Sequence, residues 1–220
     1  MQLDIERILI SRDEIAERVR GIAARLAADL RRELEDEGST ESDHRIVLIP
    51  IMTGSIVFVA DLIRELPLKL SMELVAVSSY PGQTMESKGA HLAGELPEGL
   101  EGKHVVLIDD ILDSGRTLHL VRSLVVGREP ASVRTCVLLD KRERRAVPIE
   151  PDYAGFEIPD EFVVGYGLDF DGYYRNLPDI ATLKPEAAGL FPPEGKPEGK
   201  TAGKPDEKQG ETQGDAPGGS

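Results

Sequence analysis

Residues 105–118 read VVLIDDILDSGRTL, and this stretch decides the fold. Its first four residues are apolar and form a short run that is typical of a strand buried on both faces. Two acids, Asp109 and Asp110, follow at the predicted carboxyl end of that strand. A polar turn containing Gly115 then leads into a helical pattern from Thr117 to Val126. Strand, polar turn and helix in this order predict one unit of an α/β domain.

The same alternation recurs along the chain. Further apolar runs that predict buried strands are Ile46–Ile51, Leu74–Val77, Val133–Leu139 and Phe162–Val164. Helical patterns cover Ser55–Leu66 and, after a capping box formed by Ser11 and Glu14, a long amphipathic stretch that ends near Gly38. Strands and helices in alternation predict a mainly parallel sheet flanked by helices, with ligands bound beyond the carboxyl ends of the strands.

Two segments lack this periodicity. From Pro185 to Ser220 the chain is rich in Gly, Pro, Glu and Lys and nearly devoid of apolar residues after Phe191, which predicts a disordered tail after a single domain over residues 1–184. The polar segment Pro81–Gly102 lies within that domain, and we expect it to be a mobile active-site lid.

Composition limits the partners. The formal net charge of -14 argues against a nucleic-acid or anionic-membrane surface, and it favours a small-molecule partner. No apolar stretch approaches the ~20 residues of a membrane span. The lone cysteine, Cys136, lies in an apolar run, so we expect a buried thiol, no internal disulfide and a cytoplasmic location.

The turn after residue 108 has a specific chemistry. Successive backbone amides from Asp113 to Thr117 at a helix N-terminus favour a phosphate monoester, and Gly115 allows the backbone to approach it closely. Ionised Asp109 and Asp110 only accept hydrogen bonds, which suits the vicinal hydroxyls of a ribose. On these residues alone, the acids could instead hold Mg²⁺, and the turn could be a plain tight connection.

The whole fourteen-residue string resembles the phosphoribosyl pyrophosphate signature of type I phosphoribosyltransferases. The resemblance implies that fold, with a small hood subdomain from the N-terminal segment and residues about 150–184. It also implies that Asp109 and Asp110 bind the ribose hydroxyls. The residues implied to bind the 5-phosphate are Asp113, Ser114, Gly115, Arg116 and Thr117.

Later segments resemble the hypoxanthine-guanine branch of that family. By this resemblance Lys141 donates to the purine O6, Phe162 stacks on the base and the Val163 backbone meets the base edge. Asp169 matches the carboxylate that binds Mg²⁺, and Arg175 matches an arginine that contacts pyrophosphate. Without the resemblance, Lys141 reads as a surface lysine and Phe162 as a core aromatic residue.

Two more segments match with differences. Thr53 and Gly54 occupy the position of the pyrophosphate loop, where relatives usually have Lys-Gly or Arg-Gly after a cis peptide, so the basic side chain is missing here. Ser79 and Tyr80 match the Ser-Tyr pair of a lid that closes over the reaction centre.

The resemblance therefore implies purine salvage. The expected reaction is Mg²⁺-dependent transfer of the 5-phosphoribosyl group from phosphoribosyl pyrophosphate to hypoxanthine or guanine, with Asp113 as the general base. A xanthine-preferring enzyme and a non-catalytic nucleotide-sensing regulator on the same fold are the alternatives. Relatives are usually homodimers or homotetramers, which is the implied assembly.

Overall fold

The central feature of the computed structural model, which describes residues 2–78 and 91–189, is a seven-stranded sheet. The helices are α1 (Arg12–Asp36), α2 (Ile56–Glu65), α3 (Arg116–Val126) and α4 (Pro185–Gly189), with 3-10 turns η1 (Gln2–Asp4), η2 (Glu41–Asp43) and η3 (Arg142–Arg144). The strands are β1 (Ile5–Ile10), β2 (Ile46–Met52), β3 (Ser71–Met72), β4 (Val75–Ser78), β5 (His91–Leu92), β6 (His104–Leu112), β7 (Ser132–Asp140), β8 (Tyr153–Glu157), β9 (Val163–Val164) and β10 (Ile180–Leu183).

The main sheet is almost entirely parallel, as the alternating pattern predicts. Its strand order is β5-β4-β2-β6-β7-β8, with β3 also paired to β2, and only β5 runs antiparallel to its neighbour. The chain leaves β2 toward β4 on one side and returns to β6 on the other side of β2. The carboxyl ends of β2 and β6 therefore flank a topological switch point, where α/β sheets bind ligands.

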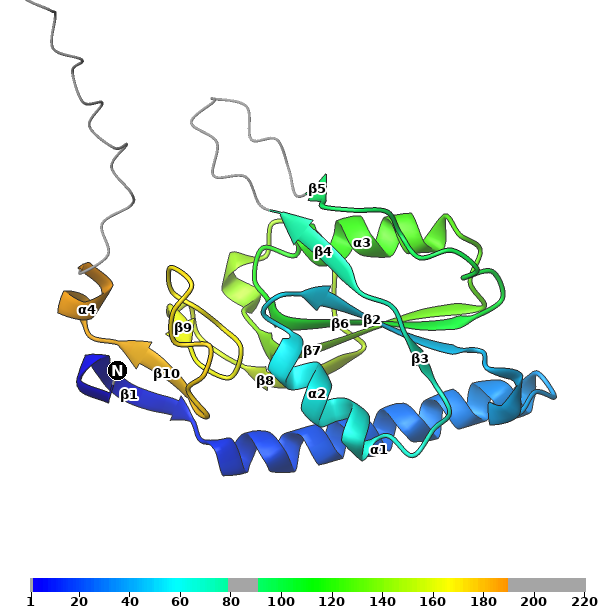
Figure 1. Cartoon of the computed structure of the whole chain (residues 1–220), viewed down its shortest axis with the longest axis horizontal. Helices are drawn as coiled ribbons and strands as arrows, with labels where there is room; N and C mark the ends of the chain where they lie inside the picture. The colour runs from blue at the N-terminus through cyan, green and yellow to red at the C-terminus, as the bar shows by residue number, and fades with distance from the viewer. Residues whose placement is uncertain (1, 79–90, 190–220) are drawn as a thin grey trace, which may run out of the picture. The chain divides into compact units, whose positions relative to one another are not determined.

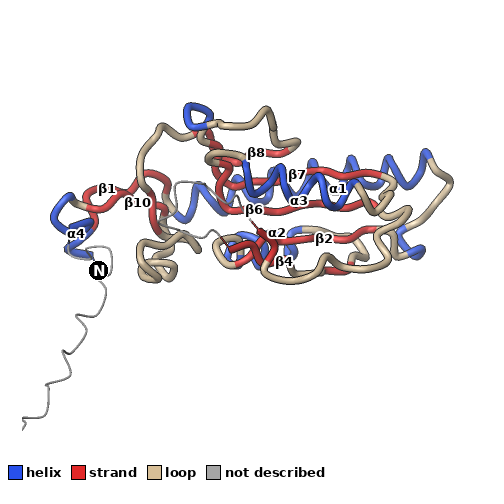
Figure 2. The backbone as a smooth tube through the Cα atoms, turned by 90° about the horizontal axis from the view of Figure 1, so that it is seen from above, coloured by secondary structure: helices blue, strands red, loops and turns tan. Residues whose placement is uncertain are grey.

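Helices cover both faces of this sheet (Figures 1 and 2). α1 and α2 pack on one face, and α3 packs on the other, each against a separate cluster of buried apolar residues. Along β6, Val106 and Ile108 belong to the first cluster, and Val105 and Leu107 belong to the second. The two-residue period of a strand thus explains why its apolar run is unbroken.

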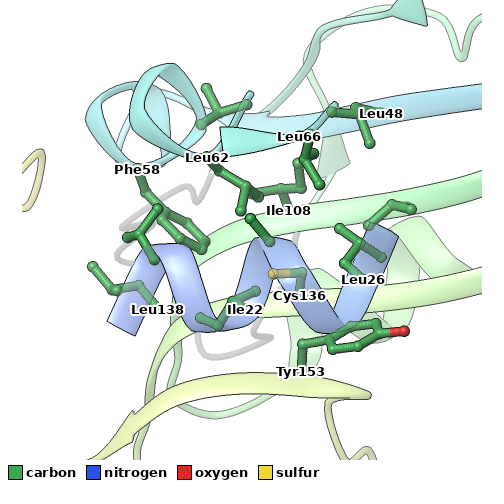
Figure 3. Packing of buried hydrophobic residues seen from close by; sticks show 14 of the residues in the cluster. Ile22, Leu26, Leu48, Phe58, Leu62, Leu66, Ile108, Cys136, Leu138 and Tyr153 are labelled. Carbon is green, nitrogen blue, oxygen red and sulfur yellow. The ribbon is translucent and has the colours of Figure 1, made fainter. Parts of the chain in front are cut away.

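Cys136 lies inside the first cluster, among Ile22 and Leu26 of α1 and Tyr153 of β8 (Figure 3). Burial raises the pKa of its thiol to about 12, so the group stays protonated at neutral pH. The prediction of a buried, unreactive cysteine is confirmed.

A second, three-stranded antiparallel sheet forms the hood, in the order β1-β10-β9. The expected hood boundary near residue 150 is wrong, because β8 pairs with β7 and extends the main sheet to Glu157. The run Phe162–Val164 contributes its strand to the hood rather than to the main sheet. Short strands with mixed composition carry little periodic signal, so their pairing depends on tertiary contacts.

The start of the first helix agrees with expectation, whereas the carboxyl end of the domain differs in detail. The capping box at Ser11 and Glu14 is present, and α1 begins there. Regular structure continues through α4, which occupies the first five residues of the segment expected to be disordered; residues 190–220 lie outside the described part of the chain. None of the helices within residues 2–78 and 91–189 is long and apolar enough to span a membrane.

Candidate active site

A cavity of about 240 Å³ opens at the carboxyl ends of β2 and β6. Residues from the predicted phosphoribosyl segment line most of it, together with the end of β2. Its lining comprises Ile51, Met52, Gly54, Val77, Asp109, Ile111, Leu112, Asp110, Asp113, Ser114, Gly115, Thr117 and Leu118. The structure thus brings the sequence-predicted acids, the glycine turn and Gly54 together around one space.

The acid pair is the most unusual electrostatic feature of this cavity. Asp109 is buried, with 7% of its surface exposed, and Asp110 beside it is half-buried. Burial, followed by the neighbouring Asp110 carboxylate, raises the pKa of Asp109 well above its ordinary value. Burial also raises the pKa of Asp110, against hydrogen bonding and the positive charge of Arg175, which lower it. Strongly perturbed adjacent acids in a cleft are typical of a functional site.

The turn after β6 has the form of an anion site. Gly115 has a φ of +79°, and a Cβ at this position would lie 2.7 Å from Ile149 Cγ2, so only glycine fits. The carbonyl of Ser114 accepts a hydrogen bond from Ala146 N at 2.9 Å, which fixes the turn. Thr117 is half-buried at the start of α3, whereas Arg116 is exposed and does not line the cavity.

Asp113 occupies a distinct position in the same turn. One carboxylate oxygen, Oδ1, is buried and has no hydrogen-bond partner among the described residues, and the other, Oδ2, lies 3.5 Å from Arg144 Nη1. A buried acceptor without a partner is costly and rare in folded proteins, so it suggests that a ligand supplies the missing donor.

The end of β2 contacts the acid pair directly. The peptide bond between Met52 and Thr53 is cis, and Thr53 itself is exposed. A Cβ on Gly54 would lie 1.7 Å from Asp110 Oδ2, so glycine is required for this carboxylate to occupy its position. A Cβ on Gly167 of the hood would lie 2.2 Å from the Gly54 carbonyl oxygen. The β2 loop at Gly54 therefore packs against the acid pair and also against the hood at Gly167.

Lys141 follows β7 and is 95% buried, since its exposed fraction is 5%. Its backbone N donates to Leu112 O at 2.9 Å, which holds the lysine beside the end of β6. The ammonium Nζ lies 3.9 Å from Asp160 Oδ1. The reading of Lys141 as an ordinary surface lysine is therefore wrong.

The two predicted base-contacting residues differ in exposure. Phe162 is 57% exposed, and its ring meets that of Phe170 edge to face at a centroid distance of 5.4 Å. Val163 is buried and pairs with Thr182 in the hood sheet. An aromatic ring exposed at this edge is free to stack on a planar ligand, which excludes the reading of Phe162 as a core residue. Neither Lys141 nor Phe162 lines the cavity at the acid pair.

Asp169 and Arg175 are joined at the hood. Arg175 Nη2 lies 2.7 Å from Asp169 Oδ1, and Arg175 Nη1 donates to the Gly167 carbonyl at 2.6 Å. The other carboxylate oxygen of Asp169 accepts from Gly172 N at 2.8 Å. Arg175 therefore links the carboxylate of Asp169 to the backbone that packs on Gly54. Ser79 and Tyr80, predicted for the lid, lie outside the described residues.

The metal-ligating side chains of this region fit a Mg²⁺ ion that takes one ligand from the protein and most of its ligands from a substrate. Within residues 2–78 and 91–189, no group of three or more acidic, histidine or cysteine side chains could hold a metal ion by itself. Mg²⁺ commonly takes one or two protein carboxylates and completes its shell with water and phosphate oxygens. The half-buried carboxylate of Asp169 offers this kind of ligand.

Two residues of this region escaped prediction from the sequence. Arg144 and Asp160 connect Asp113 with Lys141 through ion pairs of 3.5, 3.7 and 3.9 Å. The only signal in the sequence is the density of charge in Lys141-Arg-Glu-Arg-Arg145, which does not tell which arginine turns toward the site.

Comparison with known proteins agrees with this geometry. The family model described as phosphoribosyl transferase domain matches residues 11–171. A hypoxanthine-guanine phosphoribosyltransferase of Streptococcus pneumoniae is 40% identical over 186 residues, which cover 84% of this chain and 97% of that protein.

Solved structures give the same result. A hypoxanthine phosphoribosyltransferase of Staphylococcus aureus superposes with a TM-score of 0.75 at 38% identity, covering 84% of this chain and 95% of that one. The hypoxanthine phosphoribosyl transferase of Trypanosoma cruzi superposes with a TM-score of 0.77 at 38% identity, covering 85% and 95%.

A parallel α/β sheet with an acid pair and a glycine turn at its switch point defines a phosphoribosyl-binding domain. The chain belongs to the phosphoribosyl transferase family, and the relatives that it matches over most of their length include hypoxanthine-guanine and hypoxanthine phosphoribosyltransferases. The predicted type I fold is thereby confirmed.

Proposed function

We propose that this chain is a purine-salvage enzyme that transfers the 5-phosphoribosyl group of phosphoribosyl pyrophosphate to hypoxanthine or guanine, which gives IMP or GMP and pyrophosphate. The observation that carries this proposal is the cavity at the ends of β2 and β6, where Asp109, Asp110 and the turn around Gly115 meet. The similarity to hypoxanthine-guanine phosphoribosyltransferases supports the same reaction.

In the proposed complex, the 5-phosphate accepts hydrogen bonds from the amides and hydroxyls of the turn after β6. The contributing residues are Asp113, Ser114, Gly115, Arg116 and Thr117. The ionised carboxylates of Asp109 and Asp110 accept hydrogen bonds from the two ribose hydroxyls. Ligand hydroxyls would compensate these acids for the hydration that they lose by burial.

The base is placed on the other side of the sugar. We assign Lys141 as the donor to the purine O6, Phe162 as the stacking ring and the Val163 backbone as the contact to the base edge. A cationic donor at O6 favours 6-oxo over 6-amino purines, because an amino group offers no equivalent acceptor.

In the proposed reaction the purine N9 forms a bond to C1 of the ribose as the bond from C1 to the pyrophosphate oxygen breaks. Positive charge grows on the sugar, as in other glycosyl transfers. The proton on N7 passes to Asp113, whose buried oxygen Oδ1 has no hydrogen-bond partner in the part of the chain that the structure describes. The leaving pyrophosphate carries away the electron pair of the broken bond.

Pyrophosphate would lie between the β2 loop and the hood. The backbone of Thr53 and Gly54 and the guanidinium of Arg175 are the proposed contacts. Mg²⁺ would be held by Asp169 together with substrate oxygens, and it would neutralise charge on the leaving group. The family resemblance implies a lid that carries Ser79 and Tyr80, which lie outside the described residues, and such a lid would keep water from the reactive sugar.

Assembly and compartment are part of the same proposal. Homodimers or homotetramers are expected from the family resemblance. The buried lone thiol of Cys136 suits a reducing cytoplasm, because it has no partner cysteine with which to form an internal disulfide.

A panel of bases tests the function. Initial rates with phosphoribosyl pyrophosphate and Mg²⁺ would be compared for hypoxanthine, guanine, xanthine and adenine. We expect kcat/KM for hypoxanthine or guanine to exceed that for adenine by at least ~100-fold, since Lys141 selects an oxygen at position 6. A preference for xanthine would shift the assignment to a xanthine enzyme, and no turnover with any base would support a regulator on this fold.

A further inference from the structure

We infer that Asp160 positions Lys141 for the 6-oxo group and that Arg144 joins this pair to Asp113, so that base recognition and proton acceptance share one chain of charges. The inference rests on the proposed function, because the roles of Lys141 and Asp113 belong to it. It adds Asp160 as a specificity-determining residue and Arg144 as a positioning residue.

The first observation is the environment of the lysine. Lys141 is buried, and a buried ammonium requires a counterion. Within the described residues its only ion pair is with Asp160 Oδ1, at 3.9 Å. That separation is too long for a hydrogen bond. Asp160 therefore balances the charge of the lysine while the donors of the ammonium remain available to a ligand.

The position of Asp160 is fixed by the backbone around it. Ile158 N donates to Asp140 O at 3.0 Å, which ties the segment after β8 to the end of β7. Glu161 N donates to Pro159 O at 2.8 Å, so the chain turns at Asp160 just before Phe162. The carboxylate is consequently held beside Lys141 by a turn that also delivers the stacking ring.

The second half of the chain of charges runs through Arg144, at the end of η3. Its Nε lies 3.7 Å from the same Asp160 oxygen, and its Nη1 lies 3.5 Å from Asp113 Oδ2. Charges thus alternate from Lys141 to Asp160, Arg144 and Asp113. Among the described residues, both ends keep hydrogen-bonding capacity: the buried Oδ1 of Asp113 has no partner, and the 3.9 Å contact between the Lys141 ammonium and Asp160 is not a hydrogen bond.

This arrangement matches a ligand that accepts a hydrogen bond at one edge and donates a hydrogen bond at another edge. A 6-oxopurine does so, with its O6 as acceptor and its N7 proton as donor. The central pair of opposite charges, Asp160 and Arg144, holds each end group without occupying it. Recognition at O6 and transfer of the N7 proton are then set by one connected element rather than by two independent side chains.

The test uses two charge-removing variants and a matched control. Asp160→Asn should raise KM for hypoxanthine about five-fold and lower the ratio of kcat/KM for hypoxanthine to that for adenine by a similar factor, as expected for loss of a partly exposed ion pair. KM for phosphoribosyl pyrophosphate should stay within about two-fold of wild type. Glu157→Gln removes a nearby exposed carboxylate that pairs with Arg142 instead, and it should change none of these constants.

For the second link, Arg144→Met should lower kcat about five-fold with little change in KM for phosphoribosyl pyrophosphate, and Arg144→Lys should recover most of that loss. Asp160→Glu should likewise restore the preference for hypoxanthine. A structural role alone would not separate kcat from KM in this way, and unfolding in urea checks that the variants are folded.

The outcomes distinguish failure of the proposed function from failure of the roles assigned to Asp160 and Arg144. A wild-type protein that uses no 6-oxopurine would contradict the proposed function. An active wild type whose constants are the same in Asp160→Asn, or change equally in Glu157→Gln, would overturn the role of Asp160. Equal kcat in Arg144→Met and wild type would overturn the role of Arg144.

Discussion

The two ends of strand β6 bury ionisable groups in opposite ways. At the amino end, His104 is 1% exposed and lies 3.2 Å from Glu33 and 3.3 Å from Glu37. Arg134 pairs with Glu33, and Arg45 pairs with Glu37, each at 2.5 Å. At the carboxyl end, two adjacent carboxylates of like charge are buried together, and their pKa values are raised.

This comparison distinguishes an end of β6 where acids are paired with cations from an end where two like charges are adjacent. At the amino end, Glu33 pairs with Arg134 and the exposed Glu37 pairs with Arg45, so each of these acids has a cationic partner within the protein. In the proposed complex, the acid pair at the carboxyl end is instead compensated by the ribose hydroxyls that donate to it. The same strand therefore carries one end where acids are paired with cations and, under the proposed function, one end where the ligand supplies the partners.

The largest expected effect is at Asp113, which lies at the carboxyl end. Asp113→Asn should lower kcat by roughly 10²–10⁴-fold, because an amide cannot accept the N7 proton. KM for phosphoribosyl pyrophosphate should change far less, since the amides of the turn remain. Steady-state kinetics measures both constants, and turnover equal to wild type would remove Asp113 as the base.

Gly54→Ala breaks the packing between the β2 loop and the acid pair. The added Cβ would lie 1.7 Å from Asp110 Oδ2, so the carboxylate must move. We expect kcat/KM for phosphoribosyl pyrophosphate to fall roughly 100-fold, as displacement by about 1 Å commonly causes. Gly21→Ala in α1 is the control, because a Cβ there meets no atom of the described residues within 4 Å, and it should leave activity unchanged. Equal losses in both variants would contradict this explanation.

Arg134→Met tests the amino end. Removal of the guanidinium leaves Glu33 short of a partner, and the free energy of unfolding should fall by roughly 1–2 kcal/mol. Activity per folded molecule should not change, because the site is at the other end of the strand. Urea unfolding and initial rates measured on the same samples would check both statements; a selective loss of kcat would show that the two ends are coupled.

Asp109→Asn should raise the free energy of unfolding at pH 7, whereas Arg134→Met should lower it. A carboxyl whose pKa is raised by folding stabilises the protein below its unfolded pKa of ~3.9, and this contribution is lost as pH rises through the folded pKa. At pH 7 the variant should therefore be more stable than wild type, by on the order of 1 kcal/mol, with the difference vanishing toward pH 4. Lower stability of the variant at pH 7 would contradict uncompensated burial.

The same raised pKa values predict how substrate binding depends on pH. The acids must be ionised to accept from ribose hydroxyls, so KM for phosphoribosyl pyrophosphate should increase as pH falls through the raised pKa of the pair. This increase should begin at a higher pH than for an ordinary carboxyl group. A KM that is flat down to pH 4 would show that the pair is not protonated there.

The sequence predicts the main sheet well and the hood poorly. Unbroken apolar runs in β2, β6 and β7 and the capping box at Ser11 are local signals, so these elements are where they are expected. The hood is built from β1, β9 and β10, which are distant in sequence and short, so only tertiary contacts define it.

The sequence likewise predicts one part of the candidate site and not another. Residues 109–117 form one contiguous segment, and all of them except the exposed Arg116 line one cavity. Arg144 and Asp160 come close to Asp113 and Lys141 only through the tertiary fold, so no spacing rule could identify these contacts. The sequence likewise does not predict the burial of Lys141, because a lysine after a strand is exposed in most proteins.

The most direct test of the account is a calorimetric titration of phosphoribosyl pyrophosphate with Mg²⁺ into wild type and the double variant Asp109→Asn/Asp110→Asn at pH 7. We predict saturable binding to wild type and a loss of affinity of at least about ten-fold in the double variant, which keeps the phosphate turn but replaces both charged acceptors for the ribose hydroxyls by neutral amide oxygens, which are weaker acceptors. Equal affinity in the two proteins would contradict the assignment of this acid pair to the sugar.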